Sequence, residues 1–150
     1  MVQIVLYQPR RKACNNRVKA LPTIGITSHV GEGYGNRHFL FFDIDKKNLD
    51  IVMQIVDTCM KDPRSRGFIV NETRKGYHVI IIGEFPWKVV NHYWSKFKNY
   101  LDRKWITLQR KRKYAILRVG GKYNRDIKTI MFCVPEPWVN HTAVKLLVKH

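Results

Sequence analysis

The segment His38–Asp45 limits the fold more than any other part of the chain. It reads His-Phe-Leu-Phe-Phe-Asp-Ile-Asp, an apolar run rich in aromatic residues that ends in two carboxylates. A short run of this kind is typical of a central β-strand. Because side chains alternate along a strand, we expect Asp43 and Asp45 on one face of the sheet, and Phe42 and Ile44 on the other.

The pattern around this strand predicts alternating strands and helices. Leu49, Val52, Val56 and Met60 recur at helical spacing and predict an amphipathic helix that ends before Pro63. The other expected elements are a strand over 2–7, a hairpin of strands 67–71 and 77–82, a long helix over 86–101, a second hairpin of strands 114–119 and 127–133, and a short helix from about residue 138.

This order predicts an α+β fold, a two-layer domain in which helices pack on a mostly antiparallel sheet. We expect one domain over residues 1–150, since a chain of this length holds one hydrophobic core. Its core would span about 38–133, with a basic N-terminal strand and loop over 1–37 and a short C-terminal helix over 138–150.

Charge limits the function classes. Lys and Arg number 28 against 11 acidic residues, which gives a formal net charge of +17, while 45% of residues are apolar. An apolar fraction this high excludes general disorder. The positive charge favours a polyanionic partner, nucleic acid first and anionic lipid second.

Neither a membrane nor an oxidising compartment is indicated. The chain has no apolar run long enough to span a bilayer, and its apolar opening is too short for a secretion signal. We therefore expect a cytoplasmic location and no membrane partner. Cys14, Cys59 and Cys133 are too far apart for a paired zinc site, so we expect free thiols, the last two in the core.

Asp43 and Asp45 are candidate metal ligands. Two adjacent carboxylates repel each other, and a divalent cation between them removes that conflict. Oxygen ligands suit Mg²⁺ or Mn²⁺. The alternative is that this Asp-Ile-Asp pattern is a solvated loop entry or a cap for the helix that follows.

His78 is a candidate functional residue because its neighbours on the predicted strand are apolar. It is either a satisfied core histidine or a polar group that faces the same sheet surface as the carboxylates. Arg74 and Lys75 lie close to it in the sequence. Metal ligands and cations for phosphate oxygens are together what a phosphoryl-transfer site needs.

Three motifs in this order resemble the archaeo-eukaryotic primase superfamily, which includes plasmid and viral primase-polymerases. The segment 41–45 is similar to its strand that ends in Asp-x-Asp, and Gly76-Tyr77-His78-Val79 to its glycine turn that ends in a histidine. The segment 116–122 is similar to its hydrophobic-Arg strand with a Gly/Lys loop. The resemblance covers about residues 38–133.

The resemblance implies a primase-like or RRM-like core and a plasmid or viral source. By it, Asp43, Asp45 and His78 are catalytic, and the two aspartates bind Mg²⁺ or Mn²⁺. It assigns the triphosphate to Arg74, Lys75, His78, Arg118 and Lys122. It also implies a single-stranded DNA or RNA template, nucleoside triphosphates as substrates, and a separate helicase or second replication subunit as a partner.

The chain departs from the family at one point. The family carries a third metal-binding aspartate on a strand before the hydrophobic-Arg segment, and here that stretch, 105–112, contains no acid. Asp102 precedes it and Asp126 follows it. Gln109 or Thr107 would be a weaker ligand at the same place.

A stretch of basic and aromatic residues without an acid is the predicted template groove, because cations hold phosphates and aromatic rings stack on bases. Its residues are Arg103, Lys104, Trp105, Arg110, Lys111, Arg112, Lys113, Tyr123 and Arg125. The alternative is a charged, solvated face. A second basic group, over 10–19, is expected to be an arm.

The sequence thus predicts a template-dependent nucleotidyltransferase, a DNA primase or primase-polymerase that uses two-metal phosphoryl transfer. Two alternatives stay open. One is a catalytically degenerate module that binds single-stranded nucleic acid, because the third carboxylate is missing. The other is a metal-dependent nuclease, which would use similar metals on a similar sheet.

Overall fold

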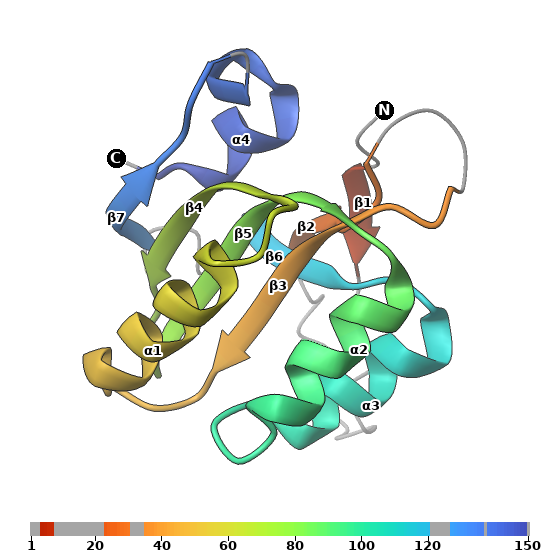
Figure 1. The fold of residues 1–150 in the computed structure, drawn as a ribbon. Coiled ribbons are helices and arrows are strands. Elements are labelled where there is room, and N and C mark those ends of the chain that lie inside the picture. Colours follow the sequence, from red (N-terminus) through yellow and green to blue (C-terminus); the bar gives the residue numbers. More distant parts are fainter. Residues whose placement is uncertain (1–3, 8–22, 31–34, 121–126, 137, 150) are drawn as a thin grey trace, which may run out of the picture.

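The computed structural model describes residues 4–7, 23–30, 35–120, 127–136 and 138–149. The strands are β1 (Ile4–Tyr7), β2 (Thr23–Thr27), β3 (His38–Ile44), β4 (Ser65–Glu72), β5 (Tyr77–Phe85), β6 (Ile116–Gly120) and β7 (Lys128–Cys133). The helices are α1 (Leu49–Met60), α2 (Trp87–Lys96), α3 (Arg103–Arg112), the 3-10 turn η2 (Trp138–Asn140) and α4 (Thr142–Leu147). Figure 1 shows this arrangement.

The strands form two antiparallel sheets. The larger has the order β3-β5-β4-β7 and the smaller the order β1-β2-β6. The fold is therefore α+β with helices packed on antiparallel sheets, as the sequence predicts. The expected strand over 2–7 is present as β1, whereas β2 was not expected.

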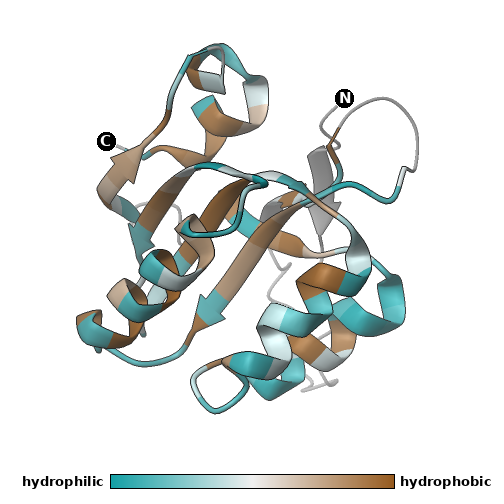
Figure 2. Cartoon of the chain, viewed as in Figure 1, coloured by the Kyte–Doolittle hydropathy of each residue, from teal (hydrophilic) through white to brown (hydrophobic). Residues whose placement is uncertain are grey.

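Helices cover one face of the larger sheet. Helix α1 packs on β4 and β5, and α2 packs on β3 (Figure 1). Phe42 points to this side and contacts the Phe97 ring, whereas Phe39 points to the other side and contacts Trp138. Helix α1 buries Ile51, Val52, Ile55, Val56 and Cys59, and Figure 2 shows apolar and polar residues interspersed along it, as in an amphipathic helix.

The outer edge of β3 is occupied by hydrogen bonds from three different parts of the chain. Phe39 N–H donates to Ser28 O at 2.7 Å, Trp94 Nε1–H donates to Phe41 O at 2.7 Å, and Asp102 N–H donates to Asp43 O at 3.2 Å. Pairing an edge strand in this way closes it to other chains. It also fixes the position of the residues at the end of β3.

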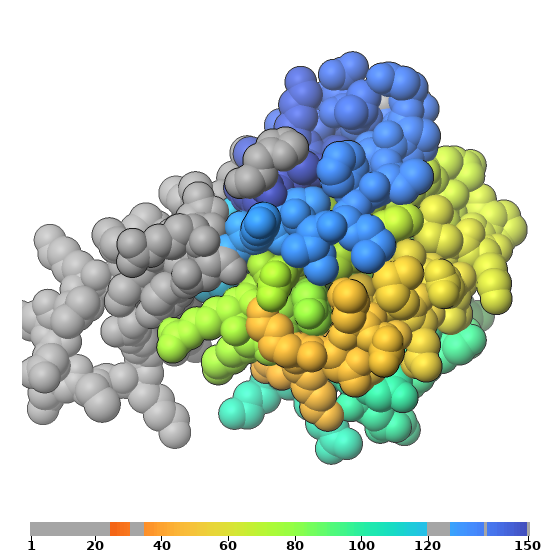
Figure 3. All heavy atoms as spheres, turned by 90° about the vertical axis from the view of Figure 1, so that its left-hand side faces the viewer, coloured from red at the N-terminus to blue at the C-terminus, as the bar shows by residue number. Residues whose placement is uncertain are grey.

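The C-terminal segment lies on the face opposite α1. The buried Asn71 side chain donates to Leu147 O at 2.7 Å and accepts from Thr129 Oγ1 at 2.6 Å. These two bonds join α4 and β7 to β4. Figure 3 shows this segment in blue beside green residues of the larger sheet.

The structure corrects three expectations. Strands β6 and β7 do not form a hairpin, because β6 pairs with β2 and β7 pairs with β4. The long helix expected over 86–101 ends at Lys96, and a separate helix, α3, follows over residues where the family resemblance implies a strand. Cys59 is buried as expected, but Cys133 is exposed because it lies at the end of the edge strand β7.

No helix in the described ranges has the length and apolar character needed to cross a membrane.

Candidate functional site

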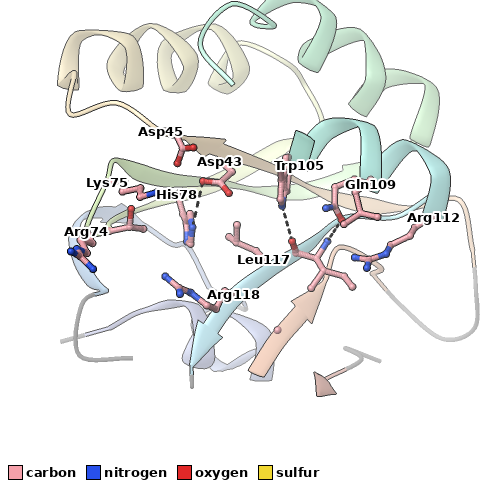
Figure 4. Close-up of a pocket in the computed structure, with 14 residues that line it drawn as sticks. Asp43, Asp45, Arg74, Lys75, His78, Trp105, Gln109, Arg112, Leu117 and Arg118 are labelled. Atoms are coloured by element: carbon pink, nitrogen blue, oxygen red, sulfur yellow. Dashed lines mark hydrogen bonds and ion pairs between the residues drawn. The ribbon is translucent and has the colours of Figure 1, made fainter. Parts of the chain in front are cut away.

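The two carboxylates at the end of β3 line one cavity of about 470 Å³. Asp43 pairs with His78 across the β3–β5 ladder, and Asp45 follows one residue after the strand ends. Figure 4 shows both carboxylates at the same wall of the cavity, so the alternation predicted for this segment holds. Figure 2 shows β3 as apolar along most of its length, with a hydrophilic position near its end.

A tight turn brings two cations to this cavity. Thr73 N–H donates to Gly76 O at 2.9 Å, and Gly76 N–H donates to Thr73 Oγ1 at 3.1 Å, so the turn is closed from both sides. Its exposed tip carries Arg74 and Lys75, and both line the cavity. A Cβ atom at Gly76 would collide with the carbonyl oxygen of Ile44, so only glycine permits this close approach.

Lys47 holds the same turn against the loop after β3. Its Nζ donates to Glu72 Oε1 at 2.8 Å and to Thr73 O at 2.5 Å. It also lies over the Tyr77 ring, 5.5 Å from the ring centroid. The cations of the turn are therefore held near the carboxylates by a side chain outside the cavity lining.

His78 is buried on β5 and faces the carboxylates. Its Nε2 lies 3.7 Å from Asp43 Oδ1, which is longer than a hydrogen bond. Burial, and then the charge of Arg118, lowers the pKa of His78 to about 3. The imidazole is thus neutral at pH 7, and the contact is not an ion pair. Its Nδ1 is buried without a hydrogen-bond partner.

Asp43 carries an unusual carboxyl group. Burial, and then the negative charges of Asp45 and Asp102, raises its pKa to about 7, while the Arg118 guanidinium acts in the opposite direction. Arg118, on β6, closes the cavity from the smaller sheet (Figure 4). A cation next to Asp43 would stabilise its charged form.

Helix α3 distributes the predicted template residues in several directions. Arg103, Lys104, Arg110 and Lys111 are exposed, and Arg110 also donates to Asn91 Oδ1 at 3.0 Å and to Ser95 Oγ at 3.1 Å on α2. Lys113 ends the helix in the left-handed conformation, with φ 63°.

Trp105 and Arg112 line the cavity instead of an outer groove. The Trp105 ring nitrogen donates to Ile116 O at 3.1 Å, and its ring packs on that of Trp94. Lys122, Tyr123, Arg125 and Asp126 lie outside the described residues, so their predicted roles stay predictions.

The chain matches no protein-family model, no curated protein and no solved structure. The resemblance to the primase superfamily therefore depends on the sequence motifs alone. The structure adds that Asp43, Asp45, Arg74, Lys75, His78 and Arg118 line one cavity.

A divalent metal ion fits the acidic wall of this cavity. Mg²⁺ commonly binds one or two protein carboxylates and completes its shell with water and phosphate oxygens. Asp43 and Asp45 supply such a pair. The raised pKa of Asp43 means that its charged form is destabilised, and a bound cation would stabilise that form. Among the residues described, no group of three or more His, Cys, Asp or Glu side chains could hold a metal ion.

The inner face of α3 was not expected to line this cavity. From the sequence, Trp105 and Arg112 are expected in a template groove and Gln109 as a weaker metal ligand, and Leu108 has no expected role. Trp105, Leu108, Gln109 and Arg112 all line the cavity. Their spacing of three, one and three residues is the signal of one helical face. The helix was not predicted, because the resemblance implies a strand over these residues.

Proposed function

We propose that this chain is a template-dependent nucleotidyltransferase of the primase or primase-polymerase type. The observation that supports it most is one cavity that is lined both by two carboxylates, Asp43 and Asp45, and by the cations Arg74, Lys75 and Arg118. Carboxylates for a metal ion and cations for a triphosphate are the two requirements of phosphoryl transfer. The cytoplasmic location and a separate helicase or second subunit belong to the same proposal.

The proposed cofactor is Mg²⁺ or Mn²⁺, with carboxylate oxygens of Asp43 and Asp45 as its protein ligands. When bound, such an ion neutralises charge on the transferred group and lowers the pKa of the attacking hydroxyl. Arg74 and Lys75 extend from a turn that Gly76 and Lys47 hold in place, so their charges are positioned before substrate arrives.

Arg74, Lys75 and Arg118 would bind the phosphate oxygens of a nucleoside triphosphate, and the neutral His78 would donate one N–H to them. In the proposed step, a 3′-hydroxyl oxygen forms a bond to the α-phosphorus. The bond from that phosphorus to the bridging oxygen breaks, pyrophosphate leaves with the electron pair, and the hydroxyl proton passes to water. The three cations oppose the charge that develops on pyrophosphate.

The template would bind along the outside of α3. Arg103, Lys104 and Lys111 are exposed there, and the whole chain has a net charge of +17. Phosphate contacts of this kind bind any sequence and weaken as salt rises. This matches a protein that copies whichever template it meets.

The test is nucleotide addition on a single-stranded template, with and without a primer, in Mg²⁺ or Mn²⁺. Asp43→Asn and Asp45→Asn should each reduce the rate by roughly 10³-fold, since metal stabilisation of such a transition state is worth several kcal/mol. Asp57→Asn is the matched control, because Asp57 is an exposed aspartate on α1 that does not line the cavity. An Asp45→Asn variant with an unchanged rate would contradict the proposal.

A second candidate is a non-catalytic module that binds single-stranded nucleic acid. The observation that favours it is the α3 wall, which presents Trp105, Leu108 and Gln109 to the cavity and no third carboxylate. It predicts template binding that is indifferent to Mg²⁺ and to Asp43→Asn, with no extended product. Shortening of the labelled strand in the same reactions would instead indicate a nuclease.

A further inference from the structure

The cavity has two chemically different ends. Figure 4 shows Arg74, Lys75 and His78 at one end, and Trp105, Gln109 and Arg112 at the other, with Leu117 between them. The proposed phosphate and metal chemistry uses only the first end. The second end is lined largely by apolar groups of α3 and β6, namely Trp105, Leu108 and Ile116.

The second end is a preformed wall. Ile116 of β6 is bound twice by α3, since its carbonyl accepts from Trp105 Nε1 at 3.1 Å and its N–H donates to Gln109 Oε1 at 2.9 Å. Gln109 is only 1% exposed, so its amide is fixed by packing as well. A rigid wall needs little ordering when a ligand binds.

We propose that this end of the cavity binds the nucleobase of a nucleoside triphosphate whose phosphates lie at the Asp43 end. This inference depends on the proposed function. The volume of about 470 Å³ falls within the range of small-molecule pockets, roughly 300–1,000 Å³. A planar base would bury apolar surface against the side chains of Trp105 and Leu108, both of which line this end.

Gln109 supplies the polar contact that such a pocket needs. Its carbonyl oxygen is used by Ile116 N–H, so the group it offers to a base is its amide nitrogen, a hydrogen-bond donor. Every base carries ring-nitrogen or carbonyl acceptors on its edge. A single donor therefore orients a base without selecting one, which suits an enzyme that copies all four.

In this proposal Trp105 binds the base of the incoming nucleotide, whereas the sequence predicts that it binds the template. The exposed cations of α3, Arg103 and Lys104 among them, remain on the outside of the helix for the template. The chain should therefore bind a nucleoside triphosphate without any template, and should bind it more tightly than the triphosphate group alone.

The test is calorimetric titration of the full chain with two probes in Mn²⁺, ATP and inorganic tripolyphosphate. Stacking of one base predicts about tenfold tighter binding of ATP. Leu108→Ser should weaken ATP binding several-fold and leave tripolyphosphate binding unchanged. This variant should fold, because Leu108 is 38% exposed. Trp105→Phe, which replaces the indole with a smaller ring, gives a second variant, in which ATP binding should weaken and tripolyphosphate binding should not.

Val139→Ser is the matched control, since Val139 is 40% exposed on η2 and does not line the cavity. Equal affinity of the wild-type chain for ATP and tripolyphosphate would overturn the base pocket and leave the proposed function standing. Equal loss of both ligands in Leu108→Ser would also overturn it. Binding of neither probe by the wild-type chain would overturn the pocket and count against the proposed function as well.

Discussion

Gly76 sets the distance between the turn that carries the cations and the strand that carries the carboxylates. A methyl group at this position would meet the Ile44 carbonyl, between Asp43 and Asp45. The two carboxylates and the two cations of the turn are thus adjacent only because one residue has no side chain.

Gly76→Ala should destabilise the chain by about 1–3 kcal/mol, the usual cost of forcing a side chain into filled space. It should also weaken binding of Mn²⁺ with ATP, because the end of β3 must shift. Urea unfolding and calorimetry measure the two effects. Gly35→Ala is the control, since a Cβ atom there meets nothing within 4 Å. Equal stability of the two variants would contradict this role of Gly76.

At the scale of elements, α3 begins at a cap that also contacts the strand of the site. The Asp102 side chain accepts from Lys104 N–H at 2.8 Å and from Trp105 N–H at 3.2 Å, while its own N–H donates to Asp43 O. The start of α3 and the end of β3 are therefore fixed to each other.

Asp102→Ala should lower the free energy of unfolding by about 1 kcal/mol, because the N-cap of α3 is lost. It should also reduce ATP affinity, because α3 supplies one wall of the cavity. Asn48→Ala removes the equivalent cap of α1 and is the matched control, with a similar loss of stability. An Asp102→Ala variant that binds ATP with wild-type affinity would contradict the expectation that this cap positions the α3 wall of the cavity.

Elements defined by local pattern could be predicted from the sequence, and those defined by distant pairing could not. The strand over 38–44, helix α1 and the β4–β5 hairpin follow from apolar spacing and a glycine turn. The pairing of β6 with β2 joins segments about 90 residues apart, and no local signal encodes it. The expected β6–β7 hairpin failed for that reason.

At the scale of the whole molecule, the two sheets meet at a pair of buried histidines. His38 lies on β3, its Nδ1 is 2.9 Å from Ser28 Oγ, and its ring centroid is 4.8 Å from that of His29. Burial, and then the charge of His29, lowers the pKa of His38 to about 4. The junction between the sheets therefore favours the neutral form of the His38 imidazole.

This junction should make stability depend on pH. Below pH 6.5 the unfolded chain binds a proton at His38 and the folded chain does not, so the free energy of unfolding falls as pH decreases from 6.5 to about 4. The loss is about 3 kcal/mol. Urea unfolding between pH 7 and 4 should show a smaller loss for His38→Gln. Parallel pH profiles for the two proteins would contradict the assignment.

The net charge of +17 should make template binding strongly dependent on salt. Replacing Arg103, Lys104 and Lys111 by Gln should reduce the slope of log affinity against log salt by about 0.7 for each lost phosphate contact. Lys61→Gln with Arg66→Gln, exposed cations away from α3, should change the slope less per charge. Equal slopes per charge for the two sets would place the template elsewhere.

The candidate site could be predicted from the sequence in part. Asp43, Asp45 and His78 stood out because they are polar residues within apolar strands, and the structure brings them to one cavity. Gln109 was expected only as a weaker metal ligand, and Leu108 had no expected role, because α3 is rich in charge and its cavity face becomes apparent only once the helix packs on β6.

The central claim is that Asp43 and Asp45 hold a divalent ion while the cations beside them hold a triphosphate. Crystals grown with Mn²⁺ and a non-hydrolysable nucleoside triphosphate test it directly, since the anomalous signal of manganese locates the ion. We expect a manganese peak bonded to both carboxylates, with the phosphates beside Arg74 and Arg118. A peak elsewhere, or phosphates bound away from this cavity, would contradict it.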